Sequence, residues 1–232
     1  MLTPRQADPM CAFSEPRGQV LLALAQARVQ PLVDGVYGPH ALLLAPDASH
    51  FPELAPPMVG LRLRIGRGAR LDGDLIASAE DLPLPSDSMA LVVVQYALRA
   101  DQAEAVLAEC ARVLAPGGVA LVMGINPLSL WRLWSRRHAA GATPGASACR
   151  RILAREDVET LQVRHFGPFL PIGRADAAGE ATRESRWLGP LRASFLLIAR
   201  KQRAQPTTLR FSRVEHRAAV SPGLAGSFRK AS

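Results

Sequence analysis

The sequence has little of what several protein classes require. No run of about 18 apolar residues occurs in its 232 residues, so we expect no transmembrane helix. The first residues, MLTPRQADPMCAFSEPRGQ, lack an apolar segment behind a basic start. They indicate no secretory signal, and we expect a cytoplasmic protein. The three cysteines, Cys11, Cys110 and Cys149, are odd in number and far apart, which argues against a disulfide framework or a zinc knuckle.

Lysine is also scarce, and the basic charge is unevenly distributed. Only Lys201 and Lys230 are lysines, so arginine supplies most of the net charge of +8. Residues 203–232 contain six Lys or Arg against one acid, Glu215. This tail could contact nucleic acid or another anionic surface weakly through charge alone, but we favour a solvated, disordered tail. We therefore expect a flexible arm over residues 1–15, one domain over residues 16–202 and a disordered basic tail over residues 203–232.

What the chain does contain is a succession of helix and strand patterns. Its 48% hydrophobic and 21% charged residues suit one globular α/β domain. Residues 90–98 (ALVVVQYAL) form a continuous apolar run, which is typical of a central parallel strand with both faces covered. Residues 58–66 alternate apolar side chains with Arg62 and Arg64, which indicates a strand at the edge of the sheet. The other expected strands are residues 40–46, 74–77, 119–125 and 192–201, and the other expected helices are residues 16–29, the start of 126–137, and 150–163.

The stretch ECARVLAPGGVALVMG, residues 109–124, predicts a sharp junction between a helix and a buried strand. Before it, Asp101 is expected to cap the helix, with Glu104 completing a capping box. Pro116 cannot continue a helix, and the glycines that follow allow a tight exit. We therefore predict a short turn within a strand–helix–strand unit. The apolar face of this helix consists of Val106, Leu107, Cys110, Val113 and Leu114, which makes Cys110 a core residue.

Taken together, these elements predict a doubly wound α/β domain with a mostly parallel, Rossmann-like sheet. In such sheets a ligand binds beyond the carboxyl ends of the strands, at the point where the strand order reverses. The loops expected at that end of the sheet are residues 45–49, 66–70, 77–82, 95–101 and 123–128.

Several of these segments carry a recognisable pattern. AEDLPL (residues 79–84), ARVLAPGG (residues 111–118) and the strand that follows resemble, in order and spacing, the core of class I S-adenosylmethionine-dependent methyltransferases. The similar branch contains quinone and other small-molecule methylases, and the resemblance spans residues 76–125. GINPLSLW (residues 124–131) and the ending ARKQRAQPTTLR also resemble a bacterial subgroup of that family.

The resemblance implies S-adenosylmethionine as cofactor and methyl transfer to a small-molecule acceptor. In that family the methyl group is already activated on a sulfonium, so the protein mainly aligns the acceptor, helped by a well-placed base. Glu80 and Asp81 are implied to hold the adenine amine, or else to serve a turn. Gln95 and Tyr96 fall near the position of the transferred methyl, or else pack at the end of a strand. The residues implied to contact the cofactor are Ala45, Asp47, Ser78, Ala79, Glu80, Asp81 and Gln95.

The sequence departs from the family pattern where the cofactor is normally bound. After the first expected strand it reads APDAS (residues 45–49) in place of a glycine-rich turn, and after the second it reads GRG (residues 66–68) in place of an acid. Ser78 replaces the acid before AEDLP. The chain is therefore interpreted as a degenerate member, and two functions stay open. One is a methyltransferase with an atypical cofactor loop, and the other is an inactive methyltransferase-like scaffold that acts through protein contacts.

A weaker hypothesis is a nucleic-acid-associated protein that uses the basic tail. An aromatic-basic face for an anionic acceptor, a lipid surface or nucleic acid is a further option. We favour instead that the two tryptophans of residues 131–137 cover the sheet and that the arginines of the same residues are solvated. The five histidines have no metal-ligand spacing, so no metal site is predicted. The residues that would form the aromatic-basic face are Trp131, Arg132, Trp134, Arg136 and Arg137.

Overall fold

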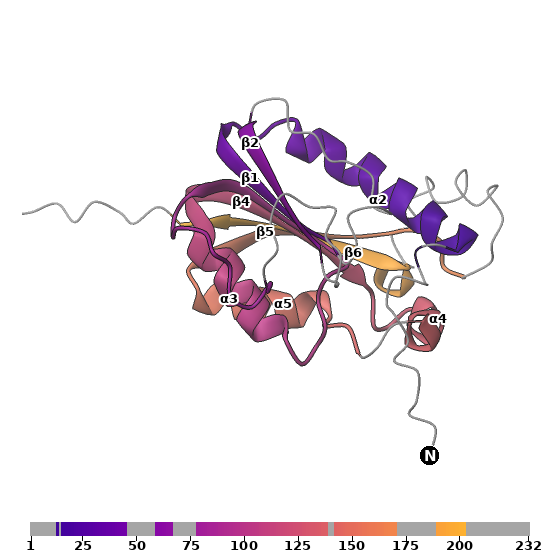
Figure 1. Cartoon of the computed structure of the whole chain (residues 1–232). Helices are drawn as coiled ribbons and strands as arrows, with labels where there is room; N and C mark the ends of the chain where they lie inside the picture. Colours follow the sequence, from indigo (N-terminus) through magenta and orange to yellow (C-terminus); the bar gives the residue numbers. More distant parts are fainter. Residues whose placement is uncertain are drawn as a thin grey trace, which may run out of the picture.

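The described part of the chain forms one six-stranded mixed sheet with helices on both faces (Figure 1). The computed structural model describes residue 13 and residues 15–45, 59–66, 78–138, 142–170 and 189–202. In sheet order the strands are β2-β1-β3-β4-β6-β5. Their bounds are β1 Gly38–Ala45, β2 Val59–Gly66, β3 Met89–Gln95, β4 Leu114–Ile125, β5 Val158–Phe166 and β6 Ser194–Lys201.

The strand pairing confirms the predicted doubly wound, mostly parallel sheet. β1 pairs in parallel with β2 and β3, and β3 pairs in parallel with β4. Only β6 runs antiparallel, between β4 and β5. The apolar β3 lies in the interior of the sheet and β2 at its edge, as their patterns predicted. After β1 the chain adds β2 on one side and returns to add β3 on the other, so the strand order reverses between β1 and β3.

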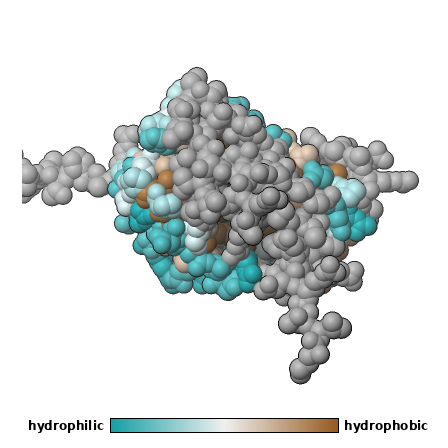
Figure 2. Space-filling model, viewed as in Figure 1, coloured by the Kyte–Doolittle hydropathy of each residue, from teal (hydrophilic) through white to brown (hydrophobic). Residues whose placement is uncertain are grey.

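The helices cover the two faces of the sheet unequally. α2 (Pro16–Val33) lies on one face, and α3 (Ala103–Val113) and α5 (Ala146–Arg155) lie on the other (Figure 1). Apolar residues of α2 pack with the strands in one buried cluster and those of α3 and α5 in another. Figure 2 shows a mainly hydrophilic outer surface over α3 and α5, as expected for amphipathic helices. The predicted apolar face of α3, including Cys110, is buried. None of the helices within the described residues is long and apolar enough to cross a membrane.

A separate apolar cluster lies at the end of the sheet where the parallel strands finish. α4 (Trp131–His138) lies there, beside the start of α2 (Figure 1). A short 3-10 turn, η1 (Gly189–Leu191), leads into β6. The cluster is formed by Phe13, Leu21, Leu22, Ala45, Ile125, Trp131, Trp134 and Ala193.

Two expected helical stretches were wrong in extent. The helix expected over residues 150–163 is α5, which ends at Arg155, and residues 158–166 form the edge strand β5 instead. Asp157 adopts a left-handed backbone conformation with φ 56°, which stops the helix and turns the chain into the strand. In the segment 126–137, a helix runs to His138 where a Trp- and Arg-rich turn was expected.

The predicted capping box of α3 is also wrong. Gln102 occupies the N-cap position, and its side chain makes no capping hydrogen bond. The Asp101 carboxylate instead pairs with Arg99 at 2.7 Å. Glu104 pairs with Arg155 of α5 at 2.9 Å. The N-cap position therefore belongs to Gln102 rather than to Asp101, and Glu104 binds an arginine of α5.

The junction after α3 lies inside the sheet rather than in a separate turn. The helix ends at Val113 and β4 begins at Leu114. Between the pairs Met89–Leu114 and Leu91–Val119, more residues of β4 than of β3 are present, so residues 115–118 form a bulge. The Pro-Gly-Gly sequence thus ends the helix where predicted, but its residues already belong to the strand.

Candidate functional site

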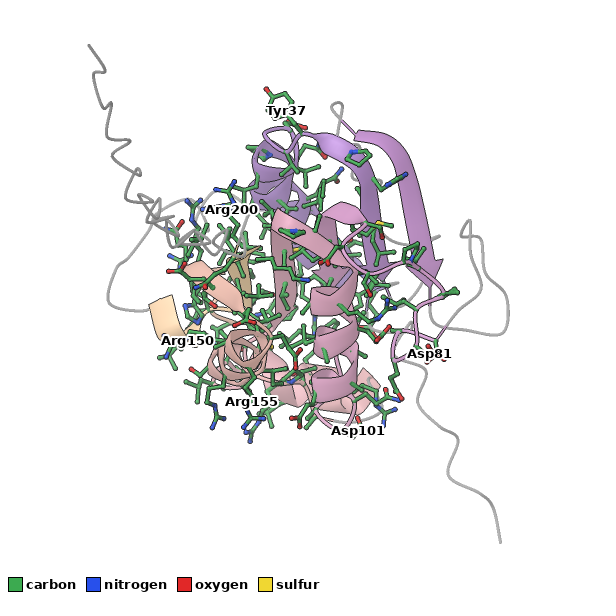
Figure 3. The ribbon with its side chains drawn as sticks, turned by 90° about the vertical axis from the view of Figure 1, so that its left-hand side faces the viewer. Tyr37, Asp81, Asp101, Arg150, Arg155 and Arg200 are labelled. Atoms are coloured by element: carbon green, nitrogen blue, oxygen red, sulfur yellow. The ribbon has the colours of Figure 1, made fainter. Side chains whose placement is uncertain are left out.

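The carboxyl ends of β1 and β3 define the candidate site. Leu44 pairs with Val94, so the next residues, Ala45 and Gln95, lie side by side where the strand order reverses. Ligands of doubly wound sheets bind in the crevice at this point. Figure 3 shows Tyr37 at the amino end of β1, with Asp81 and Asp101 toward the opposite end of the sheet. The predicted residues Ala45 and Gln95 are therefore neighbours at the expected end.

Gln95 is the most unusual polar residue of this site. Its side chain is fully buried, with 0% exposure, although it carries both a donor and an acceptor. Neither Nε2 nor Oε1 has a hydrogen-bond partner among the described residues. Leaving a buried amide without partners costs about 1–3 kcal/mol, so such a group calls for a functional explanation. Within the described residues, Gln95 thus has an unused donor and acceptor at the end of the sheet where doubly wound folds bind ligands.

Glu80 and Asp81 lie on a tight turn with exposed side chains. Ser78 forms an isolated β-bridge with Asp81. The Glu80 N–H donates to Ser78 Oγ at 3.3 Å, and the Asp81 N–H donates to the Ser78 carbonyl at 3.2 Å. Leu82 is buried in the same apolar cluster as Leu44, with Ala79 packed against that cluster. Glu80 and Asp81 therefore form a turn, which was one of the two alternatives from the sequence. Both side chains are exposed to solvent at this end of the sheet.

The turn is fastened to α3 by two residues that the sequence analysis left without a role. The Leu82 N–H donates to Glu109 Oε2 at 3.1 Å. Arg112 donates to the carbonyl of Leu82 and to that of Leu84, each at 2.9 Å. Arg112 also pairs with Glu109 at 2.8 Å, and this hydrogen bond is the main reason why the pKa of the Glu109 carboxyl is lowered. Opposite charges three residues apart on a helix were the signal that could have identified this pair.

Replacing Arg112 with methionine is expected to destabilise the protein by about 1–3 kcal/mol, because two backbone carbonyls and Glu109 lose their donor. The pKa of the Glu109 carboxyl is lower in the folded protein than its ordinary value of about 4.3, so the ionised carboxylate stabilises the fold above about pH 4.3. This contribution is lost as the pH falls below about 4.3 and through the lowered pKa of the folded state. The difference in the free energy of unfolding between wild type and Arg112→Met should therefore become smaller in acid. Urea unfolding at several pH values measures this.

The matched control is Arg155→Met, because Arg155 forms an exposed ion pair with Glu104. Such a pair contributes little, so the control should lie within about 0.5 kcal/mol of wild type. Equal destabilisation by the two changes would contradict an anchoring role for Arg112.

Tyr96 packs at the end of β3, in agreement with the structural interpretation. Its backbone is left-handed, with φ 53°, and its N–H donates to the Met123 carbonyl at 3.1 Å. The phenol oxygen lies 3.0 Å from Ser194 Oγ, and the ring centroid lies 4.9 Å from that of Phe13. Burial raises the pKa of the Tyr96 phenol far above its usual range, so the group is not a base at neutral pH. No sequence signal pointed to Ser194 or Phe13 as its partners.

The two tryptophans of α4 cover the end of the sheet, as favoured. Both are buried, and their ring centroids are 5.2 Å apart. Trp131 Nε1 donates to the Pro168 carbonyl at 2.9 Å, and Trp134 Nε1 donates to the Glu15 carboxylate at 3.2 Å. An aromatic-basic face built on these two rings is therefore wrong, because the indoles point inward.

Several predicted features fall where the structure describes nothing. Asp47 and most of residues 45–49 lie outside the described residues, as do the loop after β2 and the strand expected at residues 74–77. The tail over residues 203–232 also lies outside them, together with all but Phe13 and Glu15 of the arm. Within the described residues, no group of three His, Cys, Asp or Glu side chains could hold a metal ion.

Comparison with known proteins points to one family. Residues 54–122 match the family model described as a methyltransferase domain. No curated protein matches the chain at a significant level.

Solved structures share the fold at low sequence identity. A SAM-dependent methyltransferase from Archaeoglobus fulgidus is 14% identical, with a TM-score of 0.58 over 82% of this chain and 96% of that one. A putative methyltransferase in complex with the Trm112 activator, from Haloferax volcanii, is 14% identical, with a TM-score of 0.55 over 86% and 100%. Geranyl diphosphate C-methyltransferase from Streptomyces coelicolor, with S-adenosyl-L-homocysteine bound, is 14% identical, with a TM-score of 0.54 over 77% and 78%.

Proposed function

We propose that this chain, whose residues 54–122 match a methyltransferase-domain model and whose fold is shared by S-adenosylmethionine-dependent methyltransferases of known structure, transfers a methyl group from that cofactor to a small-molecule acceptor. The buried amide of Gln95 at the strand reversal, which has no partner among the described residues, carries this proposal. A scaffold under no demand to bind a ligand would gain stability from an apolar residue at this position.

The residues at the site have the chemistry that the cofactor needs. The Gln95 amide is neutral, so it can both donate and accept a hydrogen bond, and it adds no positive charge beside a sulfonium. The carboxylates of Glu80 and Asp81 are exposed and can accept from ribose hydroxyls or the adenine amine. The bound cofactor would supply a methyl group already activated on sulfur. We assign its binding to Ala45, Asp47, Ser78, Ala79, Glu80, Asp81 and Gln95.

The protein's part in the reaction is then mainly binding and alignment. The turn with Glu80 and Asp81 is held by Glu109 and Arg112, which limits the freedom that its carboxylates lose when a ligand binds. Because the Tyr96 phenol is partly buried and hydrogen-bonded to Ser194, it orients the end of β3 rather than removing a proton. A rigid scaffold of this kind raises the rate by alignment.

Calorimetric titration of the purified chain with S-adenosylmethionine and S-adenosylhomocysteine tests the proposal. We expect saturable binding in the micromolar range, weakened about tenfold or more when Glu80 and Asp81 are both changed to alanine. The exposed acid Glu104, which lies on α3, gives the control Glu104→Ala, which should bind as wild type does. A flat titration at millimolar ligand would contradict the proposal.

A catalytically inactive scaffold is the second candidate, and the apolar cluster at the end of the sheet favours it. There, Phe13, Trp131 and Trp134 pack closely together beside Ala45. The similar structure from Haloferax volcanii is a methyltransferase in complex with an activator protein. A scaffold would work through such protein contacts, so it would give the flat titration and yet keep a stable fold.

A further inference from the structure

Large apolar side chains are exposed around α4, at the same end of the sheet as the candidate site. Leu133 on α4 is 58% exposed, and Leu128, in the loop before α4, is 70% exposed. α4 directs its two tryptophans inward, so its outer face presents Leu133 and Arg132 to solvent. Exposed apolar residues that gather in one region mark contact surfaces more often than single ones do. The exposed apolar residues of this region are Leu128, Leu130, Leu133, Phe169, Leu170 and Leu191.

Hydrogen bonds hold the three segments that carry these residues together. Trp131 Nε1 donates to the Pro168 carbonyl, which fixes α4 beside Phe169 and Leu170. Asn126 Nδ2 donates to the Arg192 carbonyl at 3.1 Å, which fixes the loop before α4 beside the segment of Leu191. We call these six residues the α4 surface. Because it rests on a fixed framework, it is built into the fold rather than being a loose loop.

The charged residues in the sequence of α4 and of the loop just before it have one sign. Residues 128–138 contain three arginines and one histidine and no acid. Arg132 is exposed between Leu130 and Leu133. Glu15, whose carboxylate accepts a hydrogen bond from Trp134 Nε1, lies against the inner side of α4. Exposed leucines beside an exposed arginine suit the interface of an anionic membrane, where apolar side chains enter the headgroup region and basic side chains meet lipid phosphates.

We propose that the α4 surface docks the protein on an anionic phospholipid surface. The leucines would enter the headgroup region, and Arg132 would lie against the lipid phosphates. This docking does not depend on the proposed methyl transfer, and it needs no cofactor.

Sedimentation of the full-length protein with vesicles tests the docking. We expect binding to phosphatidylcholine vesicles in which one lipid in three is phosphatidylglycerol, and on the order of tenfold weaker binding to pure phosphatidylcholine. Leu133→Asp and Arg132→Glu should each weaken binding to the anionic vesicles on the order of tenfold. The matched control is Leu161→Asp on β5, because Leu161 is 57% exposed, almost as much as Leu133, but lies on the edge strand.

Two further variants keep the result interpretable. Leu128→Asp repeats the test at a residue outside α4, and it should weaken binding in the same way. It serves if Leu133→Asp lowers the melting temperature of the protein. A full-length variant in which the six Lys and Arg of residues 203–232 are glutamine should still bind, because the docking residues are elsewhere. Failure of wild type to bind anionic vesicles would overturn the proposal and point to an acidic protein or a second copy as the occupant. Loss of binding in the tail variant alone would overturn it in favour of the tail.

Discussion

Replacing Gln95 with methionine is expected to weaken cofactor binding and, at the same time, to stabilise the protein. Methionine has a similar length but no amide, so it fills the same buried position at the end of β3. The free protein loses a buried donor and acceptor that have no partners among the described residues, so the free energy of unfolding should rise by about 1 kcal/mol. The complex loses the hydrogen bonds that we assign to the cofactor, so its affinity should fall about tenfold or more.

The two readouts must be measured on the same preparation, by urea unfolding without ligand and by titration with S-adenosylhomocysteine. A matched control is Thr160→Val, because the Thr160 hydroxyl is also buried without a partner among the described residues. Thr160 lies on β5, at the opposite edge of the sheet from β1 and β2. The control should be as stable as wild type or up to about 1 kcal/mol more stable, with unchanged affinity.

A higher free energy of unfolding together with a lower affinity in Gln95→Met would show that Gln95 binds the ligand rather than only packing at the end of its strand. If Gln95 only packs at the end of its strand, methionine should leave the affinity unchanged. If its amide has a structural partner, methionine should instead lower the stability. Either of these results would remove the observation that carries the proposed methyl transfer, whereas the vesicle experiment would be unaffected.

The sequence predicted the centre of this fold well, because there the local pattern and the tertiary environment agree. The apolar run of β3 can be covered only inside a sheet, and the alternating arginines of β2 suit an edge. The position of Gln95 at the carboxyl end of β3 followed from the same pattern. What a pattern cannot show is that the amide lacks partners, since this depends on every side chain packed around it.

The errors lie where a tertiary contact outweighs a local preference. Asp101 and Glu104 fit a capping box, but Gln102 takes the N-cap position, and Glu104 pairs with Arg155 of another helix. Residues 158–163 could continue a helix, but they pair with β6 and become a strand. Similarly, the contact of Tyr96 with Ser194 joins residues 98 positions apart, and nothing in either local sequence announces it.

Replacing Gly118 with alanine is expected to lower the free energy of unfolding by about 1–3 kcal/mol. A Cβ at this position would lie 2.8 Å from the Ala115 carbonyl oxygen and 3.1 Å from the Ala90 carbonyl oxygen. Both atoms belong to the backbone of the bulge and of the adjacent β3, so a rotamer change cannot relieve the contacts. A loss of this size is a large fraction of the stability of an ordinary domain, and urea unfolding can resolve it.

Gly189→Ala is the control, because a Cβ at Gly189 meets no atom within 4 Å, and this change should stay within about 0.5 kcal/mol of wild type. The comparison bears on the candidate site as well as on stability. The bulge joins α3, which anchors the turn of Glu80 and Asp81 through Glu109 and Arg112, to β4, which pairs with the strand that ends in Gln95. Gly118→Ala should therefore also weaken cofactor binding under conditions where the variant is still folded. Equal stability of the two alanine variants would mean that the bulge relaxes freely, and it could not then hold α3 and β3 in a fixed relation.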